Sequence, residues 1–152
     1  MLEGRTLEQG ILEAQRRGVA EADPWFDIDG WDSAAKAAAL ANVLMDARLT
    51  PHDVDRKGIG RLTPSKLLEV DRAGKRVVLL SRARRGKDGV KLKVRAEVLA
   101  RNDILAAARG TSNLLVLETD LMGQLGVFTL DPGLEQTAYG LFSDVVDIAR
   151  SI

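Results

Sequence analysis

The chain contains no cysteine and only one histidine, His52, among its 152 residues. The lack of cysteine excludes disulfides, thiol catalysis and cysteine-ligated zinc sites, and it fits a cytoplasmic protein. One histidine cannot build a multi-imidazole metal site, and the position of His52 after Pro51 favours a solvent-facing turn residue. No run of about 18 apolar residues is present, so we expect no membrane partner. The first residues also lack the basic start and apolar stretch of a secretory signal.

Aromatic residues make up only 4% of the chain, yet Trp25, Phe26 and Trp31 lie in one short acidic segment. Five acids are interleaved with them: Glu21, Asp23, Asp27, Asp29 and Asp32. Apolar rings exclude water, and carboxylates then bind cationic or hydroxyl groups more strongly, so we predict a binding pocket here. Asp23, before Pro24, fits better as a turn acid that binds local amides. The spacing of the acids does not match the EF-hand loop, so no metal site is predicted.

Charge is balanced overall but unevenly distributed along the chain. The formal net charge is zero, whereas residues 72–101 carry eleven Lys or Arg against only Asp88 and Glu97. Such a segment could contact nucleic acid or an anionic cofactor. Its regular alternation with apolar residues and its lack of aromatics favour a solvated strand face instead. We therefore do not expect a nucleic-acid partner, and the role of the basic segment stays open.

Apolar periodicity predicts about four helices and about four strands. The predicted helices are 6–17, 32–48, 63–72 and 134–152, and the predicted strands are 77–80, 90–99, 114–119 and 126–130. Residues 20–31 and 49–62 are predicted to be loops, and residues 103–109 a short helical turn. This order indicates an α+β fold in one domain, residues 1–152, with a mixed or antiparallel sheet covered by the helices. The last helix is expected to turn these residues toward the core: Ala138, Leu141, Phe142, Val145, Val146 and Ile148.

The pair formed by Asp32 and Lys36 is the sharpest candidate for chemistry. Asp32 is a predicted N-cap, and Lys36 follows one helical turn later on the same face. Lys36 shares its stripe with Leu40 and Val43, so we expect it to point inward and to be partly buried. Such a lysine beside an acid can hold a charged substrate or transfer a proton. The alternative is a surface ion pair worth only about 0.3 to 0.5 kcal/mol, and the pattern alone leaves both readings open.

Residues 14–45, AQRRGVAEADPWFDIDGWDSAAKAAALANVLM, resemble the substrate-binding segment of homoserine dehydrogenase. The family pattern is close to AQxxGYAExDPxxDxxGxDxAxK followed by a helix. The matching residues are Ala14, Gln15, Gly18, Ala20, Glu21, Asp23, Pro24, Asp27, Gly30, Asp32, Ala34 and Lys36. Val19 stands where the family often has Tyr. Weaker resemblance extends over residues 53–60, 110–123 and 136–149, whereas 131–135 depart from the family's GPGAG-like turn.

This resemblance implies the substrate-binding and dimerisation domain of an NAD(P)-dependent oxidoreductase. Such enzymes interconvert homoserine and aspartate 4-semialdehyde on the way to threonine and methionine. Carried over position by position, Glu21 and Asp27 would bind the amino end of this small amino-acid substrate. Lys36 would be the proton-transfer residue, and Asp32 would orient it. The resemblance also implies a homodimer.

Glycine-rich phosphate loops are missing from the sequence. It contains neither a GxGxxG after a strand nor a Walker sequence, so nothing in it is predicted to hold the pyrophosphate of NAD(P). The family's Rossmann domain, its second lysine and its Asn-Gly-Thr segment have no counterpart here. We therefore expect no turnover by these residues alone, with cofactor-binding residues unknown and a separate Rossmann-domain chain as a candidate partner. The alternatives are a non-catalytic amino-acid-binding or protein-interaction remnant and, least favoured, a nucleic-acid-binding module.

Overall fold

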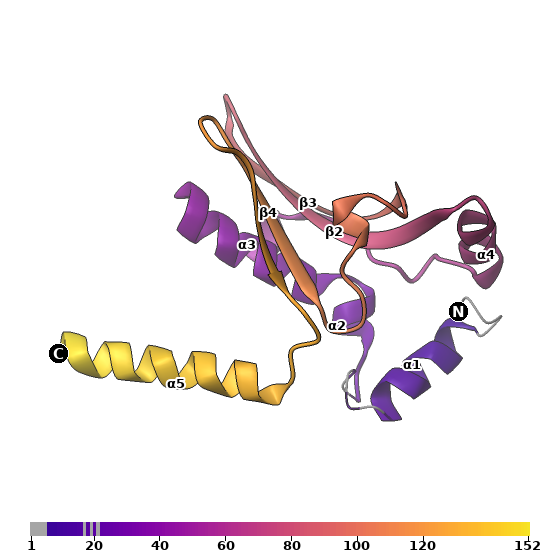
Figure 1. Ribbon diagram of the computed structural model, residues 1–152, viewed down its shortest axis with the longest axis horizontal. Helices are drawn as coiled ribbons and strands as arrows, with labels where there is room; N and C mark the ends of the chain where they lie inside the picture. The colour runs from indigo at the N-terminus through magenta and orange to yellow at the C-terminus, as the bar shows by residue number, and fades with distance from the viewer. Residues whose placement is uncertain (1–5, 17, 19, 21) are drawn as a thin grey trace. The chain divides into compact units, whose positions relative to one another are not determined.

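The computed structural model describes residues 6–16, 18, 20 and 22–152 (Figure 1). The chain divides into two compact units, Met1–Arg101 and Asn102–Ile152. Both units contain helices and strands, so the predicted α+β class is confirmed. The strands form two small sheets, of three and two strands, instead of the single sheet expected. The single domain predicted for residues 1–152 stays a prediction.

A long antiparallel hairpin forms the centre of the first unit. It consists of β2 (Lys75–Gly86) and β3 (Gly89–Ala100), which are paired along their full length. The Asp88–Gly89 signal correctly predicts the turn, where Gly89 adopts a φ of 99° that suits glycine. The first arm is longer than the predicted strand because the basic residues near the turn also pair with β3.

The predicted loop at 49–62 contains two regular elements. A 3₁₀ helix, η1 (Pro51–Asp53), is followed by β1 (Asp55–Arg56), which pairs in parallel with β3. The sheet order is therefore β1–β3–β2. The prediction of a plain loop was wrong because a two-residue strand is too short to show alternation.

Two of the helices of the first unit follow their capping signals. Helix α1 (Leu7–Arg16) begins after Thr6, whose hydroxyl accepts the N–H of Gln9. Helix α4 (Pro64–Arg72) begins after Thr63, whose hydroxyl accepts the N–H of Lys66. These side chains satisfy amides that lack partners inside a helix, which is why Thr followed by a helical pattern is a dependable start signal.

The acidic segment departs from its prediction in two respects. It contains a short helix, α2 (Trp25–Ile28), and the next helix, α3 (Trp31–Met45), has Gly30 and not Asp32 as its N-cap. Gly30 has a φ of 78°, a conformation open to glycine, so the chain turns there directly from α2 into α3. Asp32 lies in the first helical turn, where a carboxylate also interacts favourably with the helix dipole.

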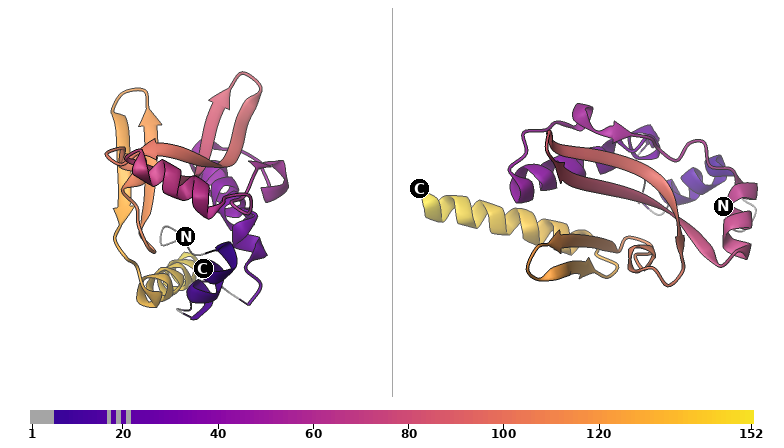
Figure 2. Two further views of the ribbon diagram at one scale, coloured as in Figure 1. Left: turned by 90° about the vertical axis from the view of Figure 1, so that its right-hand side faces the viewer. Right: turned by 90° about the horizontal axis from the view of Figure 1, so that it is seen from above.

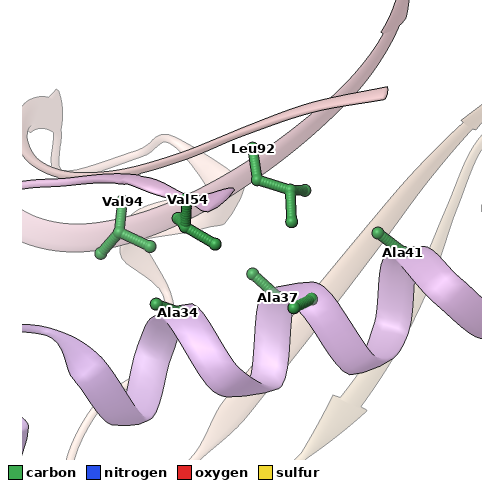
Figure 3. Packing of buried hydrophobic residues seen from close by; sticks show 7 residues of the cluster. Ala34, Ala37, Ala41, Val54, Leu92 and Val94 are labelled. Atoms are coloured by element: carbon green, nitrogen blue, oxygen red, sulfur yellow. The ribbon is translucent and has the colours of Figure 1, made fainter. Parts of the chain in front are cut away.

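Alanines bring α3 close to one face of the sheet, and these contacts form the core (Figures 2 and 3). The buried residues of this cluster are Ala34, Ala37, Ala38, Ala41, Val54, Leu92 and Val94. A methyl side chain lets the helix backbone approach the strands, and the branched side chains of the sheet fill the remaining space. The core is therefore narrow, with small residues on the helix and larger ones on the sheet.

The second unit consists of a hairpin and a long helix. Strands β4 (Asn113–Thr119) and β5 (Gly123–Thr129) pair antiparallel, and α5 spans Leu134–Ser151. The helical turn expected at 103–109 is the 3₁₀ helix η2 (Ile104–Ala106). No residue of α5 is buried, so the predicted inward face of this helix does not form a core within the second unit. Most of its apolar stripe is exposed there, and Val146 is half-buried.

None of the helices in the described part of the chain is both long enough and apolar enough to cross a bilayer.

Candidate functional site

Asp32 and Lys36 form an ion pair in the first turns of α3. The Lys36 Nζ donates to the Asp32 Oδ2 at 2.7 Å, as their spacing of one turn predicts. The lysine is not partly buried, however: its side chain is 72% exposed, and that of Asp32 is 38% exposed. The expectation of an inward-facing lysine is therefore wrong for the described structure.

The geometry of α3 explains this exposure. At about 100° per residue, Lys36 lies roughly 160° around the helix from Ala34, which is fully buried. Lys36 shares its side of the helix with Leu40 and Val43, as predicted, but these are 44% and 82% exposed. The helix thus has two apolar stripes. The sheet packs on the stripe of small residues, and the stripe that carries Lys36 stays open.

The other acids predicted for the site lie before α3. Asp27 is exposed on α2, and Glu21 lies outside the described residues. The Asp23 carboxylate accepts the N–H of Trp25 at 3.1 Å, which agrees with its predicted role in a turn. Trp25 and Phe26 are each 56% exposed, so they do not line an enclosed pocket in this structure. The predicted pocket is therefore open on this side.

Trp31 behaves differently from the other two aromatic residues of the segment. The guanidinium carbon of Arg56 lies 3.8 Å from the centroid of its ring, and His52 meets the ring edge-on at 5.1 Å. Arg56 also donates through Nη1 to the carbonyl of Asp29. His52 is exposed, as predicted, but it also supports Trp31. Sequence reasoning missed Arg56, because no local pattern connects a residue of β1 with a segment so far upstream.

Two other features of the described residues were considered as sites, a surface hollow and possible groups of metal ligands, and neither involves Asp32 and Lys36. A hollow beyond the C-terminal end of α3 is lined by residues 46–49 and by the hairpin turn, and it contains neither Asp32 nor Lys36. Within the described ranges, no three His, Cys, Asp or Glu side chains are grouped as metal ligands.

The basic face of the hairpin is partly neutralised by acids of the same sheet. Arg82 binds Glu97 through two hydrogen bonds of 2.8 and 2.7 Å, and Arg95 binds Asp55 of β1. The hydrogen bond from Arg82 lowers the pKa of the Glu97 carboxyl below its ordinary value. These pairs link neighbouring strands, which agrees with a solvated structural face.

The comparison with known proteins identifies the family. A model of the homoserine dehydrogenase family matches residues 1–146. The chain belongs to the homoserine dehydrogenase family. It is 36% identical over 149 residues to the homoserine dehydrogenase of Methanocaldococcus jannaschii, with 98% of this chain and 43% of that protein covered. It is 34% identical to the NAD(+)-dependent homoserine dehydrogenase of Pseudomonas canavaninivorans, with 97% and 42% covered.

Solved homoserine dehydrogenases have the same fold. The structure from Thiobacillus denitrificans superimposes with a TM-score of 0.86 at 31% identity, covering 97% of this chain and 34% of that chain. The chain therefore spans less than half the length of these homoserine dehydrogenases. The resemblance inferred from residues 14–45 is confirmed, and it extends over nearly the whole sequence.

Proposed function

We propose that residues 1–152 are the substrate-binding part of a homoserine dehydrogenase, which holds homoserine or aspartate 4-semialdehyde. The observation that carries this proposal is the Asp32–Lys36 ion pair, which lies on the face of α3 that the sheet leaves open. Membership of the family supports it, and so does the agreement of both residues with the motif pattern given in the sequence analysis. The proposed enzyme is an oxidoreductase of amino-acid biosynthesis, in the route to threonine and methionine.

Each site residue has a proposed task. Lys36 would handle the proton at the substrate oxygen that changes between hydroxyl and aldehyde: its neutral amine would accept the hydroxyl proton during oxidation, and its ammonium would return that proton to the aldehyde oxygen during reduction. Asp32 accepts a hydrogen bond from Lys36 and would fix the direction of that group. Asp27 and Glu21 would bind the substrate's amino group, since carboxylates pair with an ammonium through charge-assisted hydrogen bonds.

The residues of this chain do not fit a dinucleotide cofactor. The sequence has no glycine-rich loop between a strand and a helix with which to hold a pyrophosphate. We therefore place the NAD(P) site, and with it the hydride chemistry, outside residues 1–152. The nucleotide-binding domain that contains this site would belong either to the same polypeptide or to a separate chain. Its residues would determine whether NAD or NADP is bound.

We propose that the nucleotide-binding domain contacts the open face of α3. Leu40, Val43 and Leu44 are all exposed beside Lys36, and contiguous apolar side chains at a surface mark interaction sites. Proton and hydride transfer also require that bulk water be excluded from the reacting atoms. A covering domain would both bury the apolar side chains and close the site over Lys36.

We also propose that the protein is a homodimer. Exposed apolar residues on β5 and α5, among them Val127, Phe128, Phe142 and Val145, support this, because so much uncovered apolar surface is unusual for a monomer. Light scattering at high protein concentration should give twice the mass of one chain. A monomeric mass would contradict the proposal.

Calorimetric titration with homoserine tests the proposed substrate. The chain should bind homoserine in preference to lysine, and Lys36→Ala should lose that binding. Lys66→Ala is the matched control, because Lys66 forms an exposed ion pair of 2.9 Å with Glu69 on a different helix, α4. Equal binding by wild type and Lys36→Ala would contradict the assignment of Lys36. Absence of homoserine binding by the wild type would favour the alternative, a non-catalytic remnant of the family.

A further inference from the structure

We propose that Arg56 and Gly58 are positioning residues of the substrate site. Together they hold residues 28–31, the segment between Asp27 and Asp32, against the connection that follows β1. This inference rests on the proposed function, because its consequence is the placement of the two carboxylates that would hold the substrate. It adds two residues that touch no substrate and act through others.

Gly58 provides the first contact, which joins two stretches of backbone. A Cβ atom at this position would overlap the carbonyl oxygen of Ile28 and would lie 2.6 Å from the Cα of Asp29. The next residue, Ile59, donates its N–H to the same Ile28 carbonyl at 2.9 Å. Only glycine allows this close approach, so the end of α2 is fixed by direct backbone contact.

Arg56 provides the second contact, with the residues on either side of Gly30 in the sequence. Its guanidinium lies over the ring of Trp31 and donates to the carbonyl of Asp29, so one planar group binds both neighbours of Gly30. Its stem fits beside Gly30, where a Cβ would meet the Cγ of Arg56 at 3.6 Å. Lysine cannot reproduce this combination, because its ammonium lacks the flat, forked donor group.

These contacts control geometry at the site without forming the core. The helix–sheet core uses Ala34 and later residues of α3, whereas the clamp formed by Arg56 and Gly58 acts on the residues before Ala34. The clamp adjoins the core at one place, where Arg56 pairs with Val94 of β3. Loss of a clamp contact should change the distance and orientation of Asp27 relative to Asp32, while most of the core stays packed. A displacement of about 1 Å in a bound geometry can reduce activity about 100-fold, so a modest shift suffices to matter.

The test compares two clamp variants with two matched controls. Arg56→Met and Gly58→Ala remove one contact each. Gly60→Ala is the control for Gly58, because a Cβ there would meet only the Ile28 Cγ2 at an ordinary 3.5 Å. Arg84→Met is the control for Arg56, since Arg84 is an exposed arginine of β2 with no ion pair among the described residues. If Gly58→Ala does not fold, Arg56→Met carries the test.

Two quantities are measured for each variant: homoserine affinity by calorimetry, and amide hydrogen exchange by NMR at the hydrogen-bonded amides of Ile28–Gly30 and Ile59, with Ala41 of the core as the reference. Each clamp variant should raise the Kd about tenfold and speed exchange at Ile28–Gly30 and Ile59 about tenfold, because Arg56→Met loses a hydrogen bond and a cation–π contact, and Gly58→Ala forces two backbone segments apart. Exchange at Ala41 should not change, and both controls should match the wild type. Uniformly faster exchange, including Ala41, would show a general loss of stability and overturn the proposal.

A double-mutant cycle tests whether Arg56 acts through Asp32. The effects of Arg56→Met and Asp32→Asn on homoserine affinity should be smaller together than their sum, because the second change removes the group that the first displaces. Strict additivity would overturn the proposal. Arg56→Lys should weaken binding as much as Arg56→Met does, and wild-type affinity in the lysine variant would show that charge alone matters, which overturns it as well.

Failure of the clamp and failure of the proposed function give different results. If the wild type binds homoserine and the clamp variants bind it equally well, the clamp is overturned and the proposed function stands. If the wild type binds no homoserine, the proposed function fails for this chain, and hydrogen exchange decides about the clamp. Unchanged exchange at Ile28–Gly30 and Ile59 in Arg56→Met would then overturn it, and selective acceleration there would support it.

Discussion

The two faces of α3 have opposite compositions and opposite surroundings. The face against the sheet consists of alanines that are at most 7% exposed, whereas the other face carries Lys36, Leu40 and Val43 beside Asp32. The larger apolar side chains are thus on the solvent side, which reverses the usual arrangement of an amphipathic helix. The difference shows that the sheet contacts only the first face, and it supports the proposal that another domain contacts the second face.

The ion pairs of α3 and α4 make the same comparison at the level of single residues. Lys36–Asp32 and Lys66–Glu69 have similar lengths, 2.7 and 2.9 Å, and both are exposed. Neither pair is expected to contribute more than a few tenths of a kcal/mol to stability. Only the pair on α3 lies beside uncovered apolar side chains, and only its residues match the family motif. Surroundings, and not geometry, therefore distinguish the candidate site from a common surface pair.

The largest expected effect concerns activity. In an enzyme reconstituted with a nucleotide-binding domain, Lys36→Ala should reduce kcat by about 100- to 10,000-fold, the usual contribution of a proton-transfer group. Its circular dichroism and melting temperature should stay close to those of the wild type, because the side chain is exposed. The Lys66→Ala variant should retain full turnover. A Lys36→Ala enzyme with wild-type kcat would show that the Lys36–Asp32 pair has no more functional importance than the Lys66–Glu69 pair.

The next effect concerns the packed face of α3. Ala34→Leu should destabilise the protein by about 1 to 3 kcal/mol, because a larger side chain at a fully buried alanine forces helix and sheet apart. Val43→Ala on the opposite face should change stability by no more than about 0.5 kcal/mol. Urea unfolding followed by circular dichroism measures both. Comparable losses from the two variants would mean that the two faces of α3 are not distinct.

The smallest expected effect concerns the outer face of the hairpin, where charges pair with each other. The Glu97 pKa is lowered by Arg82, so the pair stabilises the folded chain above the ordinary carboxyl value of 4.5. That contribution, about 0.5 kcal/mol at this partial exposure, should disappear as the pH falls through the lowered pKa of the folded state.

Arg82→Met should therefore reduce the loss of stability on acidification, measured by urea unfolding between pH 7 and pH 3, and Arg84→Met should not. An unchanged acid dependence in Arg82→Met would show that the pair contributes nothing measurable. The solvated reading of this face would then rest on strand alternation alone.

Local signals in the sequence were sufficient for several elements. Thr63 with Pro64 predicted the start of α4, and Asp88–Gly89 predicted the hairpin turn, because each depends on hydrogen bonds or dihedral angles of adjacent residues. The spacing of Asp32 and Lys36 likewise predicted their ion pair. Family motifs located the candidate site, which composition and periodicity alone left open.

Features that depend on distant residues could not be predicted in this way. Periodicity showed that α3 has an apolar stripe, but it could not tell which of two stripes meets the sheet, so Lys36 was placed on the wrong side. The same limitation applies to α5, whose apolar stripe is mostly exposed in the described structure. The contacts of Arg56 with Asp29 and Trp31 join segments far apart in the chain, and β1 depends on its partner strand.

Mapping homoserine onto the chain by NMR tests the central claim most directly, that the open face of α3 is the substrate site. Amide resonances of Trp31–Lys36 and of Leu40 should shift on addition of homoserine, and those of α4 and the hairpin turn should not. The same addition to Lys36→Ala should leave all resonances in place. Shifts confined to the hairpin or to α4, with none on α3, would contradict the account.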